Sequence, residues 1–188
     1  MRPDRKTEIV NIAATLFKDK GYSAVTMRDI AQAMNIKAAS LYNHIRSKHE
    51  ILVLIIIAIA EEYTHTISSI VESDENAIEK LEKVVQLHID ITVRNPEALA
   101  SLNNDWMHLP KAELAYFLKM REEYEEMFRS IVTKGIQDGE IKNSNPEVII
   151  FSMLSTLRTL YLWYGKKNDF NSKSLTDNLS KVLLRGIV

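Results

Sequence analysis

Apolar residues recur three and four positions apart through most of this 188-residue chain, the spacing that places them on one face of an α-helix. No sustained alternation of apolar and polar residues, which is typical of a half-buried strand, interrupts that pattern. With only five glycines and four prolines, the sequence is also poor in turn residues. The pattern therefore predicts an all-α protein of about nine helices.

The beginning of the chain predicts two short helices. The first has its apolar face over residues 9–17 and ends at Gly21, in the position of a carboxy-terminal cap. The second begins at Thr26, because Thr26 followed by Asp29 has the spacing of a capping box.

A tight turn over residues 34–37 is predicted next, since Asn35 tolerates the left-handed backbone conformation. A third helix follows over residues 38–45, and a longer one begins near Ser47. Later helices are separated by prolines and polar connectors. They are predicted over residues 75–94, 96–108, 111–137, 146–164 and 174–187.

Three short helices with a turn of about four residues between the last two have the layout of a helix-turn-helix, whose third helix enters the DNA major groove. The apolar positions would face inward: Ile30, Ala31, Ile36, Leu41 and Ile45. The outward positions carry polar or amphipathic side chains suited to phosphates and base edges: Arg28, Lys37, Ser40, Tyr42, Asn43, His44 and Lys48. An ordinary three-helix subdomain with a solvated polar face is the alternative interpretation.

Charge is distributed unevenly along the chain. Residues 1–50 hold nine Lys and Arg against five Asp and Glu, a net charge of +4, so the remaining residues carry −5 of the total of −1. A basic segment suits a polyanionic partner, because each cation placed beside a phosphate releases condensed counterions.

Other features of the sequence limit where the protein is expected in the cell and which chemistry it is expected to perform. The chain has no cysteine, which is compatible with a reducing cytoplasm, and its charged start lacks the pattern of a secretory signal. The longest apolar run, Ile51–Ala60, is half of the roughly 20 residues that cross a bilayer, so a buried helix and no membrane contact are expected. Metal, phosphate-loop and nucleophile-elbow motifs are absent, so neither an enzyme nor a cofactor is expected.

The stretch Thr26–Leu52, TMRDIAQAMNIKAASLYNHIRSKHEIL, resembles the signature of the tetracycline-repressor (TetR) family of transcriptional regulators. Phe17 and Gly21 extend the resemblance, which covers about the first 55 residues. It implies a DNA-binding domain over residues 1–47 and a helical ligand-binding and dimerisation domain over 48–188.

The resemblance also implies roles for individual residues. Thr26, Tyr42, His44 and Lys48 would contact phosphates, and Arg28, Lys37, Ser40 and Asn43 would reach bases or the adjacent backbone. Ala38 is small enough to let the start of the third helix approach DNA closely. Ala39 and Lys37 depart from the glycine and serine that are common in the family, which leaves the operator sequence open.

In the family, the last two long helices of each subunit form a homodimer interface that suits a palindromic operator. The corresponding helices here are 146–164 and 174–187, although burial within one subunit would also explain their apolar residues: Ile149, Ile150, Met153, Leu157, Leu160, Leu179, Val182 and Leu183. Repression and activation are both open, because the outcome depends on where the operator lies.

An apolar or amphipathic small molecule is the expected effector. Its candidate contacts are aromatic and methionine side chains, for which plain core packing is the alternative: Trp106, Phe117, Tyr124, Phe128, Met153 and Tyr161. Residues 121–141 resemble the domains of family members that sense acyl-CoA or lipid-like compounds. Arg121 and Arg158 would meet an anionic ligand, or else form salt bridges.

A different class of function is a helical protein-interaction module that does not bind DNA. Salt dependence separates the two functions, because binding to DNA weakens steeply as salt rises and binding through apolar surface does not.

Overall fold

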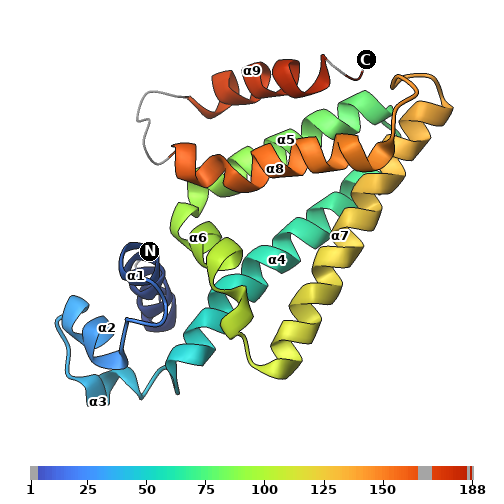
Figure 1. Cartoon of the computed structure of the whole chain (residues 1–188). Helices are drawn as coiled ribbons and strands as arrows, with labels where there is room; N and C mark the ends of the chain where they lie inside the picture. Colours follow the sequence, from blue (N-terminus) through green and yellow to red (C-terminus); the bar gives the residue numbers. More distant parts are fainter. Residues whose placement is uncertain (1–3, 165–170, 186, 188) are drawn as a thin grey trace. The chain divides into compact units, whose positions relative to one another are not determined.

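The computed structural model describes residues 4–164, 171–185 and 187. Over this part of the chain it contains nine α-helices, one short 3₁₀ helix and no strand, which confirms the predicted all-α class (Figure 1). In chain order the helices are α1 (Arg5–Lys20), α2 (Met27–Ala33), α3 (Ala38–Leu41), α4 (Lys48–Glu72), α5 (Ala77–Arg94), α6 (Pro96–Asn104), the 3₁₀ helix η1 (Trp106–His108), α7 (Lys111–Gln137), α8 (Pro146–Tyr164) and α9 (Ser172–Leu184).

The chain divides into two compact units. The first unit comprises Met1–Ala60 and Glu97–Leu118, and the second comprises Glu61–Pro96 and Lys119–Val188. The long helices α4 and α7 therefore each contribute residues to both units.

Local sequence signals set the ends of α1. The Asp4 carboxylate accepts hydrogen bonds from the backbone N–H groups of Lys6 and Thr7, at 2.7 and 3.0 Å, and so satisfies two donors that the first turn leaves free. At the other end Gly21 has a φ of 81° and donates its N–H to the Phe17 carbonyl, which confirms the predicted cap.

Helices α2 and α3 pack together around the predicted turn. Asn35 has a φ of 54°, the left-handed conformation that the sequence predicted. Regular helix ends at Leu41 rather than near Ile45, and residues 42–44 continue as turns. Leu41 and Ile45 are both buried and anchor this segment.

The apolar start of α4 lies in the core of the first unit. Ile51, Leu52, Ile55 and Ile56 are all buried there. By length and composition alone α4 would be able to cross a membrane, a test that the core helix of a soluble protein also passes.

The helix predicted over residues 96–108 is interrupted. α6 ends at Asn104, and η1 follows after Asp105. Leu109 takes an extended conformation, φ −62° and ψ 143°, which residues before proline favour, so the chain leaves the α conformation ahead of Pro110. Short 3₁₀ segments are common at such helix ends.

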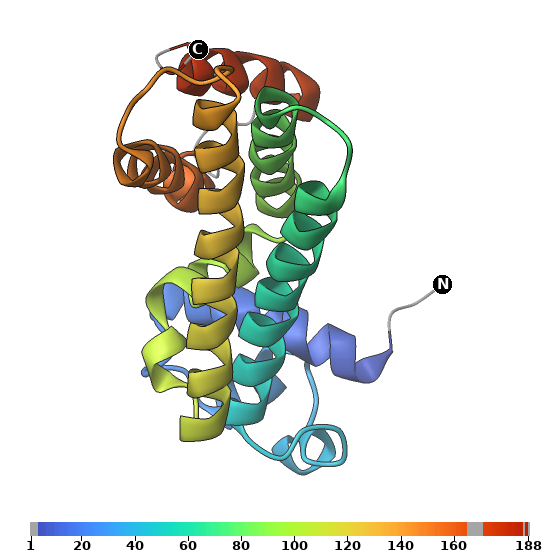
Figure 2. The same ribbon diagram turned by 90° about the vertical axis from the view of Figure 1, so that its right-hand side faces the viewer.

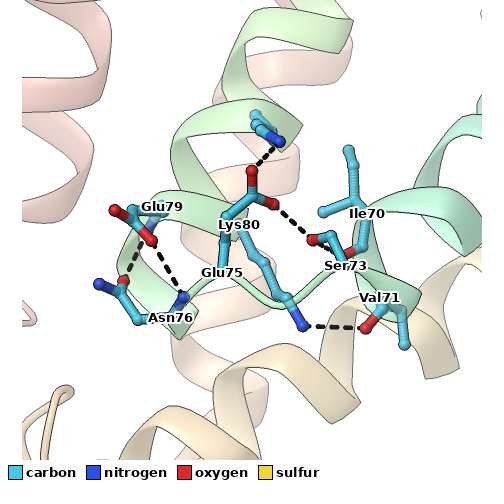
Figure 3. Close-up of polar contacts among 8 residues, drawn as sticks. Ile70, Val71, Ser73, Glu75, Asn76, Glu79 and Lys80 are labelled. Atoms are coloured by element: carbon cyan, nitrogen blue, oxygen red, sulfur yellow. Dashed lines mark hydrogen bonds and ion pairs between the residues drawn. The ribbon is translucent and has the colours of Figure 1, made fainter.

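In the second unit, polar side chains connect the end of α4 to the start of α5 (Figure 3). The buried Lys80 donates its ammonium to the Val71 carbonyl at 2.9 Å, which satisfies an acceptor in the last turn of α4. Asn76 and Glu79 form a capping box at the start of α5.

Helix α5 is central in the second unit, because α8 and α9 both pack against it (Figure 1). The ends of α5 and α7 also come close, as Figure 2 shows for α5 and the carboxy-terminal part of α7. A Cβ atom added to Gly135 of α7 would lie 2.6 Å from the Ala77 Cβ atom. Gly135 therefore permits this close approach.

Candidate nucleic-acid interface and effector site

The candidate DNA-binding face begins at the amino terminus of α2. The Thr26 hydroxyl accepts a hydrogen bond from the Asp29 N–H at 3.2 Å, and the Asp29 carboxylate accepts the Thr26 N–H at 2.7 Å. These bonds confirm the predicted capping box. Hydrogen bonds from the side chain and then the backbone of Thr26 lower the pKa of Asp29, so this carboxyl is ionised at neutral pH.

The Thr26 hydroxyl proton is also committed to Asp29, with an oxygen–oxygen distance of 2.5 Å. A hydroxyl has one proton to donate, so in this structure Thr26 has none left for a phosphate. A phosphate contact by Thr26 stays a prediction that requires this proton to turn outward.

The other polar residues predicted to face DNA are exposed, apart from Lys48. The exposed residues are Arg28, Lys37, Ser40, Tyr42, Asn43 and His44, and Ala38 between them is half-buried. They surround the short helix α3, whose inner side is held by the buried Leu41 and Ile45. Tyr42, with 53% of its surface accessible, is the only large aromatic among them. This segment therefore presents hydrogen-bond donors and the rings of Tyr42 and His44 to solvent, which suits base and phosphate contacts.

Lys48 differs from its neighbours because it is half-buried. Its ammonium donates to the carbonyl oxygens of Tyr22 and Val25, both at 2.8 Å. Burial lowers the pKa of Lys48, and the nearby Asp105 carboxylate opposes that shift.

The six candidate effector residues do not share one unit. Trp106 and Phe117 belong to the first unit, where their rings lie 6.0 Å apart between centroids. The other four belong to the second unit and are all buried: Tyr124, Phe128, Met153 and Tyr161.

A buried polar cluster in the second unit, formed by Tyr63, His88, Thr92 and Tyr124, was missed by the sequence analysis except for Tyr124. His88 Nε2 lies 2.9 Å from the Tyr124 hydroxyl, and the Tyr63 ring lies 4.7 Å from the His88 ring between centroids. Desolvation, and then the positive charge of Arg158, lower the pKa of His88 to about 3, so the imidazole is neutral. Desolvation likewise raises the pKa values of Tyr63 and Tyr124, which keeps both phenols protonated.

Two atoms of the buried polar cluster have no hydrogen-bond partner among the residues that the structure describes: His88 Nδ1 and Thr92 Oγ1. A neutral imidazole has one donor and one acceptor, so whichever role Nε2 takes toward Tyr124, Nδ1 keeps the other role unfilled. Such orphaned groups are costly in a protein interior and call for a partner. The sequence signal was a histidine and a threonine four residues apart on the apolar face that includes Leu81 and Val84.

The two arginines considered for an anionic ligand both face Glu125. Arg158 Nη2 lies 2.6 Å from its carboxylate, and Arg121 Nε lies 3.6 Å away. Burial opposes ionisation of Glu125, but the hydrogen bond and charge of Arg158 outweigh it and lower its pKa. Of the two roles left open by the sequence, the salt bridge is the one present here.

Two family models together match most of the chain. The model described as "Bacterial regulatory proteins, tetR family" matches residues 9–55, and the model described as "Tetracyclin repressor-like, C-terminal domain" matches residues 74–187. The chain belongs to the tetR family of bacterial regulatory proteins. It is therefore a DNA-binding transcriptional regulator, as its amino-terminal signature indicated.

Relatives of this TetR-family chain are similar over nearly its whole length. The HTH-type transcriptional repressor KstR2 of Rhodococcus jostii (strain RHA1) is 26% identical over 185 residues, 97% of this chain and 91% of the relative. The solved structure of the ketosteroid transcriptional regulator KstR2 of Mycobacterium tuberculosis is 20% identical and has a TM-score of 0.93, covering 100% of this chain and 97% of that one.

A further TetR-fold neighbour is AibR, solved in complex with isovaleryl coenzyme A and operator DNA. It is 23% identical, with a TM-score of 0.80 over 95% of this chain and 97% of that one. Both structural comparisons confirm the predicted fold: an amino-terminal helix-turn-helix domain with a helical carboxy-terminal domain.

Proposed function

We propose that this TetR-family chain is a homodimeric repressor that leaves a palindromic operator when a small amphipathic ligand binds. The exposed polar set around α3 carries the proposal. These side chains are the proposed operator contacts: Thr26, Arg28, Lys37, Ala38, Ser40, Tyr42, Asn43 and His44. The proposed DNA-binding domain spans residues 1–47, and the proposed effector-binding and dimerisation domain spans residues 48–188. A cytoplasmic location follows from binding to bacterial DNA.

Exposed apolar side chains on α8 and α9 support a homodimer. Most of the apolar residues that the sequence analysis noted on these helices are buried against their own subunit, so packing within the subunit accounts for them. Leu179 and Leu183 are half-buried and Val182 is exposed, and α8 also exposes Val148, Phe151 and Leu162. Phe151 and Val182 are each 72% exposed. Large exposed apolar residues on neighbouring helices favour a protein interface.

The buried polar cluster of the second unit supports an effector site there. It combines neutral donors and acceptors, two of them unpaired within the described part of the chain, with the aromatic ring of Tyr124. A ligand with a polar group near an apolar chain would satisfy those atoms, and the acyl thioester of an acyl-CoA has this chemistry. The complex of AibR with isovaleryl coenzyme A supports the same ligand class.

Selection of bound sequences from a random duplex pool tests the DNA-binding part of the proposal. A palindromic site should be enriched, and its affinity should fall steeply with salt, because each neutralised phosphate contributes about 0.9 to the slope of log K against log salt. Failure to enrich any duplex would contradict the proposal and favour the protein-interaction module.

Release of the selected operator tests the effector part. Isovaleryl-CoA and longer acyl-CoA thioesters should release it, whereas free coenzyme A and the free carboxylic acids should not. Thr92→Val should weaken the response, while Ser180→Ala, which removes another buried unpaired hydroxyl in α9, should leave it unchanged. Equal responses of the two variants would count against the buried polar cluster as the effector site.

A further inference from the structure

The Lys48 ammonium is fully occupied by the turn between α1 and α2. Besides its 2.8 Å bonds to the carbonyl oxygens of Tyr22 and Val25, its Nζ atom lies 3.5 Å from the Ser23 carbonyl oxygen. A lysine ammonium has three N–H donors, so each has a backbone carbonyl of this turn within reach. No donor is left over for a phosphate oxygen.

The Tyr22 ring covers another side of the same ammonium. Nζ lies 4.2 Å from the ring centroid, within the range of a cation–π contact. Tyr22 is itself buried and packs edge-to-face on Phe17 at 5.0 Å between centroids. The ammonium is therefore held against a buried aromatic side chain of the core.

The turn held by Lys48 leads directly into α2 and α3, the helices of the predicted DNA-binding motif. Residues 22–25 precede Thr26, the N-cap of α2, and α2 packs against α3. We propose that Lys48 is a positioning residue for operator binding: it fixes the 22–25 turn, and through it the direction of α2 and α3, without contacting the operator. This assignment differs from the phosphate contact that the family resemblance implied for Lys48.

The segment at the end of α6 reaches the same turn. The His108 ring of η1 stacks on the Tyr22 ring, with centroids 5.1 Å apart and planes 28° apart. Burial raises the pKa of Tyr22, and the charge of the Asp105 carboxylate raises it further. The same carboxylate opposes the fall in pKa that burial causes at Lys48. The turn therefore receives contacts from α4 and from η1 together.

Lysine reactivity in the wild-type protein tests this inference, which rests on the operator binding proposed above. In free protein treated with an acetylating reagent, Lys48 should react at least about tenfold more slowly than the exposed Lys37, because its bonds to the carbonyls must open first. Adding operator should protect Lys37 and leave the rate at Lys48 unchanged. Equal reactivity in free protein, or protection of Lys48 by operator, would overturn the inference.

The free-protein rates require no DNA, so they show whether the 22–25 turn holds the Lys48 ammonium even if no duplex binds. Absence of operator binding would overturn the proposed function instead.

Two substitutions separate positioning from phosphate binding. Lys48→Arg keeps the charge, but its planar fork does not match three carbonyls that converge on one atom. It should lose operator affinity by about tenfold or more, as should Lys48→Met, with the salt slope of both variants unchanged. Wild-type affinity for Lys48→Arg, or a slope reduced by about one in Lys48→Met, would assign a phosphate contact to Lys48.

Discussion

His88 Nε2 lies 2.9 Å from the Tyr124 hydroxyl oxygen and so joins α5 to α7 inside the second unit. Because His88 is buried and its pKa is lowered to about 3, the folded protein holds it neutral where an unfolded chain would protonate it. Burial of the neutral His88 therefore makes the stability of the second unit depend on pH.

Stability should fall as pH decreases from about 6.5 toward 3, because the unfolded state binds a proton at His88 that the folded state excludes. The stability that the neutral His88 contributes is fully present above the pKa of this histidine in the unfolded chain, and it is lost progressively as pH falls below that value. Urea unfolding between pH 5.0 and 6.5 should show a slope shallower by up to about 1 kcal/mol per pH unit in His88→Gln than in wild type. His65→Gln, at an exposed position of α4, should retain the wild-type slope; identical slopes in all three proteins would contradict the assignment.

Gly135→Ala should destabilise the second unit. Alanine gains up to about 1 kcal/mol of helix propensity, but its Cβ would lie 2.6 Å from the Ala77 Cβ and 2.7 Å from the Ile141 Cδ1 atom. Overpacking of this kind costs about 1–3 kcal/mol, so a net loss of about 1 kcal/mol is expected in denaturant unfolding. Adding Ala77→Gly should recover part of the loss, and a more stable Gly135→Ala protein would show that the helices separate easily.

Tyr42→Ala should weaken operator binding by about tenfold or more, the cost of losing a hydrogen bond to a charged phosphate. Its thermal midpoint should stay at the wild-type value, since the side chain is exposed. Fluorescence titration of labelled operator gives the affinity, with Tyr116→Ala as an exposed tyrosine outside the helix-turn-helix. Unchanged affinity in Tyr42→Ala at physiological salt would remove Tyr42 from the interface.

Phe151→Glu should convert the proposed dimer to monomers, because a charge in an apolar interface leaves its carboxylate desolvated and unpaired. Sedimentation velocity should show the lower mass, and binding to the palindromic operator should be lost with it. Met107→Glu places the same charge on an exposed apolar residue outside α8 and α9 and should remain dimeric. A dimeric Phe151→Glu protein would place the interface elsewhere.

Local structure followed from the sequence because neighbouring residues decide it. The cap at Gly21, the capping box of Thr26 with Asp29 and the left-handed Asn35 all depend on contacts within about four residues. The order of the helices and the exposed polar face around α3 followed from the same spacing rules. The 3₁₀ segment after Asp105 was missed, since the apolar periodicity of α6 continues through it.

Only the tertiary structure decided which distant groups meet. Lys48 reaches carbonyls 23 to 26 residues earlier, and His88 meets Tyr124 36 residues later. Sequence spacing describes one helix at a time, whereas these contacts depend on how separate helices pack. For the same reason, spacing identified Lys48 as a cation near α2 and α3, but only the packing of the helices shows that its ammonium binds the turn over residues 22–25 that precedes α2.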